Sequence, residues 1–116
     1  MKVLFTGDRS WTDRNSIRKR LEILPPDTEI IVGDAKGLDT IVIELAWEMG
    51  LKVNGPHKAN WNEHGKAAGP IRNRAMLDLE PDLVIAYHPD IEKSKGTKDC
   101  VNEAKKRNIC VEIYNI

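Results

Sequence analysis

The segment GPIRNRAML (69–77) combines two arginines and an asparagine directly after a glycine and a proline. Its apolar residues have helical spacing and predict a helix over 72–79: Ile71, Ala75, Met76 and Leu79. In such a helix Arg72, Asn73 and Arg74 stand at the N-terminus, whose partial positive charge disfavours cations. An arginine binds phosphate or carboxylate through two parallel hydrogen bonds, and an asparagine adds a directional amide. The segment therefore predicts an external anion beside Arg72 and Asn73; alternatively, both arginines point into water.

A second polar segment, TGDRSW (6–11), follows a short apolar run that is typical of a buried strand. Gly7 permits close backbone approach, while hydroxyl and N–H groups of the loop can hold a phosphate or a ribose. Arg9 can pair with a phosphate, and Trp11 can either stack on a base or cap the core. The candidate ligand-binding residues of this loop are Thr6, Gly7, Asp8, Arg9, Ser10 and Trp11.

The third segment, VGDAKGLD (32–39), again reads as a strand, a glycine-containing loop and the start of a helix. Its G-x-x-x-G spacing differs from the dinucleotide fingerprint and from the ATP-binding P-loop. Gly33 and Gly37 can nevertheless let backbone donors reach a phosphate at a helix start. Asp39 is a candidate ligand-binding residue, although it can equally be a helix cap or another structural residue.

The fourth segment, KSKGTKD (93–99), opens the last long amphipathic stretch. Thr97 is expected to be the N-cap after Gly96, leaving free N–H groups for an anion. Asp99 can act on a ribose hydroxyl or as a general acid–base, or it can simply complement the helix dipole.

Trp61 and His64 lie on the approach to the arginine segment. The three histidines, which also include His57 and His88, lack metal-ligand spacing. The sequence therefore assigns neither a metal nor a cofactor.

Strand-like and helix-like segments alternate along the whole chain. The expected strands are 2–7, 29–33, 51–56 (broken by Asn54-Gly55-Pro56), 82–89 and 109–116; the expected helices are 14–24, 38–50, 72–79 and 95–108, with a polar loop before the third helix. This alternation predicts an α/β fold with a mostly parallel sheet of about five strands and helices on both faces. Ligands of such folds bind at the carboxyl ends of the strands, where all four segments fall.

Composition limits the function classes. The 116 residues fit one domain, 1–116, and 18 basic residues balance 18 acidic ones. This zero net charge argues against nucleic acid as a partner. No run approaches the roughly 18 apolar residues of a membrane span, so no membrane partner is expected. Cys100 and Cys110 are too few for a disulfide scaffold, which favours a cytoplasmic location.

Together, the segments TGDRSWTDR, VGDAKGLD, NWNEHGKAAGPIRNRAM and KGTKD resemble the YspA-like family of the SLOG superfamily. This superfamily also holds the Lonely Guy phosphoribohydrolases and the DNA-processing protein DprA. The resemblance implies a Rossmann-like three-layer domain that binds nucleotides or nucleotide-derived molecules. Arg72 and Met76 match the arginine–methionine spacing of the Lonely Guy branch. Of that branch's P-G-G-x-G-T-x-x-E loop only Gly96 and Thr97 match, and Cys100 stands where the catalytic glutamate would be.

The sequence thus favours phosphate-cradling loops that bind a nucleotide or a nucleotide-derived small molecule. The alternative is an enzyme that hydrolyses the N-glycosidic bond of a nucleoside 5′-monophosphate, with Arg72 on the phosphate and Asp99 activating water as tentative catalytic residues. A DNA-associated protein like DprA is a third interpretation, which the neutral charge disfavours. The sequence leaves open whether the chain forms a homo-oligomer.

Overall fold

The computed structural model describes residues 1–115, which form one five-stranded sheet in the order β3-β2-β1-β4-β5. Every neighbouring pair is parallel. The strands are β1 (Lys2–Gly7), β2 (Glu29–Gly33), β3 (Lys52–His57), β4 (Leu83–Tyr87) and β5 (Cys110–Tyr114). This confirms the parallel sheet of about five strands. Residue 116, at the end of the last predicted strand, lies outside the described residues.

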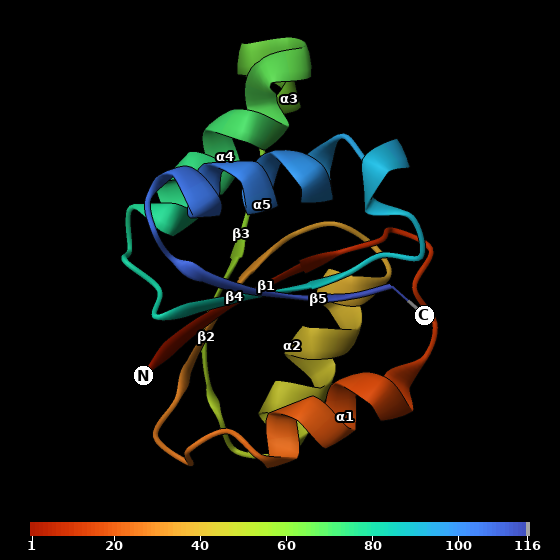
Figure 1. The fold of residues 1–116 in the computed structure, drawn as a ribbon, viewed down its shortest axis with the longest axis vertical. Coiled ribbons are helices and arrows are strands. Elements are labelled where there is room, and N and C mark those ends of the chain that lie inside the picture. Colours follow the sequence, from red (N-terminus) through yellow and green to blue (C-terminus); the bar gives the residue numbers. More distant parts are fainter. Residues whose placement is uncertain (116) are drawn as a thin grey trace.

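Helices cover both faces of the sheet, as Figure 1 shows. On one face lie α1 (Arg14–Glu22) and α2 (Leu38–Glu48), and on the other lie α4 (Ala68–Leu77) and α5 (Gly96–Lys106). The short helix α3 (Trp61–His64) projects beyond α4, to which it is joined by a 3-10 turn (Gly65–Ala67). Another 3-10 turn (Ile91–Lys93) precedes α5. The three-layer α/β architecture is therefore confirmed.

Side chains of the strands alternate between two apolar layers, as the pleat of a strand requires. Val3 and Phe5 pack against the α1 and α2 layer, whereas Leu4 packs against the α4 and α5 layer. By the same alternation, the last residues of β1 and β2 that face α4 and α5 are Thr6 and Gly33. This places part of the TGDRSW and VGDAKGLD segments under α4.

The third predicted helix starts earlier than expected. Helix α4 begins at Ala68 rather than at residue 72, so Arg72 lies in its second turn. The Gly69-Pro70 pair does not delay the helix, because a proline in the first turn loses no hydrogen bond that the helix would otherwise make. The prediction that Arg72, Asn73 and Arg74 occupy a helix N-terminus is therefore wrong, and their placement needs another explanation.

Two further local predictions are also wrong. The polar loop before α4 contains α3, whose N-cap is Asn60: its side chain accepts the Glu63 N–H at 3.1 Å. The third strand is not broken at Asn54-Gly55-Pro56 but continues to His57 with a register irregularity against β2. It can carry Pro56 because β3 is an edge strand of the sheet.

Candidate ligand-binding site

The Arg72 side chain reaches from α4 to the carboxyl end of β2 and is only 13% exposed. Its Nη1 donates to Asp34 Oδ1 at 2.8 Å and to the His57 carbonyl at 3.4 Å. Its Nε donates to Asn73 Oδ1 at 3.1 Å. The guanidinium is therefore held at the strand edge by an internal ion pair, not left in water.

The absence of a side chain at Gly33 leaves space for the Arg72 guanidinium. A Cβ placed on Gly33 would lie 2.7 Å from Arg72 Nη1 and 3.0 Å from Asp39 Oδ2. Both distances are at or below the closest approach that real side chains show, so a side chain at this position would push the arginine away. The VGDAKGLD segment thus contacts the arginine segment directly, through a glycine that packs against a side chain.

Asn73 connects the arginine segment to the fourth segment. Its side chain is almost fully buried, and its Nδ2 donates to the Gly96 carbonyl and to Asp99 Oδ2, both at 3.2 Å. Arg74 points toward α5, where Nη1 lies 3.5 Å from Asp99 and Nη2 lies 3.3 Å from Glu103. The buried amide thereby fixes the start of α5 relative to Arg72.

Asp39 is a buried carboxyl group beside this arginine. It is 5% exposed, and its Oδ2 accepts the Ala35 N–H at 3.1 Å. Burial raises the pKa of Asp39 to about 7, against the opposing effects of the Ala35 hydrogen bond and the Arg72 charge. The N-cap of α2 is Gly37, so Asp39 is not the cap of its helix.

The TGDRSW loop packs onto the start of α2, and Gly7 and Gly37 allow that close contact. The Leu38 N–H donates to the Asp8 carbonyl at 3.1 Å, and a Cβ on Gly37 would collide with the Arg9 carbonyl oxygen. A Cβ on Gly7 would lie 2.5 Å from Leu38 Cγ. One of the N–H groups at the start of α2, that of Leu38, is therefore already bonded within the chain.

The side chains of the TGDRSW segment point in different directions. Trp11 is 7% exposed, packs edge-on against Tyr87 at 5.3 Å between ring centroids, and donates its indole N–H to the Asp13 carbonyl. Two roles were predicted for Trp11, and the structure shows the packing role in the core rather than a position at the candidate ligand site. Arg9 and Ser10 are exposed, and the Asp8 carboxylate accepts the Ser10 N–H at 3.0 Å.

The beginning of α5 also differs from the prediction. Thr97 is not the N-cap: it is the second residue of α5 and is buried, and its N–H donates to Ser94 Oγ at 3.0 Å. Ser94 fulfils the capping role because its hydroxyl lies three residues before the N–H it accepts. Gly96 is exposed, and a Cβ there would meet nothing within 4 Å.

Cys100, directly after the fourth segment, cannot replace the glutamate expected at its position. It is fully buried, and burial raises the pKa of its thiol to about 12. A thiol with that pKa stays protonated near neutral pH and is a poor acid–base group.

The structure therefore brings together six of the predicted residues around one guanidinium: Gly33, Asp39, Arg72, Asn73, Gly96 and Asp99. Thr6 is buried and faces the same layer. Sequence reasoning missed Asp34 and the His57 carbonyl, the two groups that hold Arg72 Nη1. The position of Asp34 directly after Gly33 was the available signal, since it follows a strand at the predicted edge.

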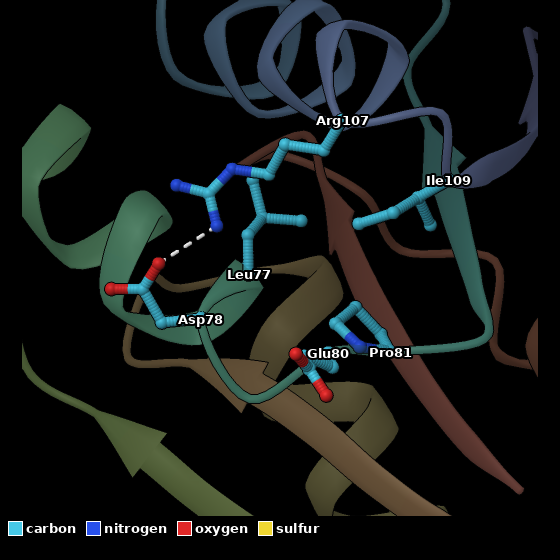
Figure 2. A pocket seen from close by; sticks show the side chains of 6 residues that line it. All are labelled: Leu77, Asp78, Glu80, Pro81, Arg107 and Ile109. Atoms are coloured by element: carbon cyan, nitrogen blue, oxygen red, sulfur yellow. Dashed lines mark hydrogen bonds and ion pairs between the residues drawn. The ribbon is translucent and has the colours of Figure 1, made fainter.

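A surface hollow of about 380 Å³ lies at the opposite, amino-terminal edge of the sheet, beyond the ends of α4 and α5 (Figure 2). One wall carries the Arg107–Asp78 ion pair, with 2.8 Å between the charged atoms. None of the candidate ligand-binding residues lines this hollow, and of the four polar segments only GPIRNRAML reaches it, through Leu77. The predicted site is therefore not this hollow but the edge around Arg72.

Over residues 1–115, no three or more His, Cys, Asp or Glu side chains are grouped so that they could hold a metal ion. In the same range, none of the helices is both long and apolar enough to cross a membrane.

Comparison with protein-family models identifies the family of this chain. The model of the YspA, cpYpsA-related SLOG family matches residues 1–64, which is more than half of the chain. The chain belongs to this family. The match runs from β1 to the end of α3. Two of the four polar segments of this SLOG chain therefore lie outside the match: GPIRNRAML and KSKGTKD.

Two similar proteins cover almost the whole SLOG chain. The Gene 61 protein of Mycobacterium phage D29 is 36% identical over 118 residues, which cover 95% of this chain and 93% of that protein. DNA processing protein A (DprA) of Streptococcus pneumoniae superposes with a TM-score of 0.79 at 19% identity. The superposition covers 97% of this chain but 49% of the DprA chain, so this chain spans about half of DprA's length. At this identity, the likeness to DprA supports the Rossmann-like fold alone.

Proposed function

We propose that this SLOG-family chain binds a nucleotide or a nucleotide-derived small molecule at the carboxyl edge of its sheet, with the anion of the ligand at Arg72. The main support is the position of the Arg72 guanidinium. It extends from α4 to the end of β2 beside Gly33 and is largely buried there. Asp34 is the exposed partner of this pair, with a side chain 30% exposed against 13% for Arg72. An incoming phosphate can take the place of that carboxylate on the guanidinium.

The surrounding residues support a preformed site. Asn73 is anchored to Gly96 and Asp99, and its Oδ1 accepts from Arg72 Nε, so the orientation of the guanidinium is fixed before a ligand arrives. A preorganised donor loses less conformational freedom on binding than a flexible surface arginine. Family membership supports the class of ligand that the resemblance implies.

The test is a thermal-shift screen of nucleotides and dinucleotides, followed by calorimetric titration of each hit. Arg72→Ala is expected to lose about 2–4 kcal/mol of ligand affinity, and Arg72→Lys to recover part of it, because an ammonium lacks the paired donors. Arg18→Ala is the matched control, since Arg18 pairs with Glu48 on the α1 and α2 face. Equal ligand affinity of wild type and Arg72→Ala would contradict the proposal.

A second candidate function is hydrolysis of the N-glycosidic bond in a nucleoside 5′-monophosphate, and Asp39 is the observation that favours it. A buried carboxyl group with a pKa near 7 is suited to general acid catalysis at neutral pH. In this reaction Asp39 gives its proton to the leaving base while water attacks C1′ and passes a proton to Asp99. The products are the free base and ribose 5-phosphate.

Release of free base from a nucleoside monophosphate tests this candidate. Both Asp39→Asn and Asp99→Asn should retain binding and lose turnover if the two carboxyl groups act as described. Binding without any released base in the wild-type protein would leave the binding function and exclude hydrolysis of the nucleotide tested.

DNA is a third ligand to include, and affinity that falls steeply with salt would mark phosphate-backbone binding.

A further inference from the structure

We propose that Trp61 is the surface on which the base of the ligand stacks, next to the phosphate position at Arg72. This inference rests on the proposed function and makes it more specific, because it requires a ligand that carries an aromatic base as well as an anion. Trp61 is 56% exposed and is the first residue of α3.

The short helix holds Trp61 in a fixed position. Asn60 Oδ1 accepts the Glu63 N–H at 3.1 Å, and Asn60 Nδ2 donates to Glu63 Oε2 at 3.0 Å. The first bond caps a free N–H at the start of the helix, and the second joins the side chains of the cap residue and Glu63. The indole therefore leaves the backbone from a structured turn rather than from a mobile loop.

Two independent connections place this indole beside the arginine site. The ring edge lies on α4: a Cβ on the buried Gly69 would be 3.5 Å from Trp61 Cη2. Gly69 precedes Arg72 by three residues, and residues with that spacing share a helix face. The second connection is His57, which lies four residues before Trp61 and whose carbonyl accepts from Arg72 Nη1 at 3.4 Å. Figure 1 shows α3 beyond the N-terminal end of α4.

This juxtaposition fits the chemistry of a nucleotide. A guanidinium binds the 5′-phosphate, and an exposed indole offers a flat face to the base. Stacking on an aromatic side chain tolerates every base, since each has a π-face. The site is therefore expected to separate nucleotides from sugar phosphates more strongly than one base from another.

The three tryptophans, all within the described residues, provide their own controls. Trp47 is 64% exposed but lies on α2, which covers the opposite face of the sheet. Trp11 is buried in the core. Trp47→Ala removes the same exposed ring at a distance from the site, and Trp47→Phe leaves Trp61 as the exposed emitter for fluorescence.

The experiment titrates wild type, Trp61→Ala, Trp61→Phe and Trp47→Ala with AMP, GMP, CMP, UMP and ribose 5-phosphate by calorimetry. Trp61→Ala should weaken nucleotide binding about five- to a hundredfold, the loss expected for one stacked base. Ribose 5-phosphate affinity should stay unchanged, and Trp61→Phe should recover part of the nucleotide affinity. Trp47→Ala should match wild type. In the Trp47→Phe protein, AMP should quench the emission while ribose 5-phosphate leaves it unaltered.

The outcomes separate this inference from the proposed function. If both ligand types bind through Arg72 but the ratio of their affinities is the same in wild type and Trp61→Ala, stacking is overturned and phosphate binding stands. If neither type binds to wild type, both proposals fail. A Trp61→Ala protein with an altered assembly state and an unaltered affinity ratio would assign Trp61 to an interface between copies and would also overturn stacking.

Discussion

Arg72 Nη1 and Asp34 Oδ1 lie 2.8 Å apart and join the middle of α4 to the loop after β2. With side chains 13% and 30% exposed, the two charges are partly shielded from solvent. The pair has two consequences that an unpaired Arg72 at a helix N-terminus, as first predicted, would not have. We expect it to stabilise the folded chain and to supply a carboxylate with which the proposed anionic ligand competes.

The first prediction concerns the stability that this pair supplies. Arg72→Ala should lower the free energy of unfolding by about 1–3 kcal/mol, because it removes hydrogen bonds of a charged group and leaves Asp34 without a partner. Urea denaturation in the absence of ligand measures the change. Arg18→Ala, which breaks a more exposed pair, should stay within about 0.5 kcal/mol of wild type. An unaltered unfolding midpoint in Arg72→Ala would show that the pair contributes nothing to folding.

The second prediction concerns the competition between Asp34 and the ligand. Asp34→Asn should bind a nucleoside 5′-monophosphate or inorganic phosphate about tenfold more tightly, equivalent to about 1.4 kcal/mol, since the anion no longer displaces a carboxylate. Asp27→Asn removes the same charge from an exposed loop at the opposite edge and should leave the affinity unchanged. Weaker binding by Asp34→Asn would instead make Asp34 a positioning residue for Arg72.

The third prediction follows from the raised pKa of Asp39. In the unfolded chain this carboxyl group ionises near pH 4, whereas in the folded chain it stays protonated up to about pH 7. The folded state therefore binds more protons between these values, and stability falls as the pH rises through this window. Asp39→Asn should gain stability relative to wild type over the same window, by up to about 4 kcal/mol at pH 8. Denaturation at pH 4, 6 and 8 measures this, and parallel pH profiles of the two proteins would exclude a buried ionisable Asp39.

The fourth prediction separates backbone strain from packing at Gly37. Both Gly37 and Gly50 have left-handed backbone angles, with φ of 71° and 73°. A Cβ on Gly37 would collide with the Arg9 carbonyl, whereas one on Gly50 would meet nothing within 4 Å. Gly50→Ala should therefore cost about 1 kcal/mol from strain, and Gly37→Ala should cost at least about 2 kcal/mol more. Equal losses in thermal or urea unfolding would show that the TGDRSW loop moves aside freely.

Much of the fold could be predicted from the sequence, because strand and helix periodicities are local properties. The apolar runs of β1, β2 and β4 and the helical spacing in α1, α2 and α5 each require only a few neighbouring residues to be recognised. Alternation of these elements then limits the arrangement to a parallel sheet with helices on both faces. The helix boundary at Ala68 was missed because tolerance of Pro70 depends on its position in the first turn, which the local composition does not show.

The sequence by itself determined which polar segments meet, since loops that follow parallel strands gather at one edge of the sheet. Only the tertiary structure decided what each residue does there. Gly7 and Gly37 make room for neighbouring chain atoms, Trp11 enters the core, and Arg72 pairs with Asp34. The physical reason is that a side chain's partner depends on the direction in which its element presents it. That direction is set by how helices pack on the sheet, through contacts between residues far apart in the chain.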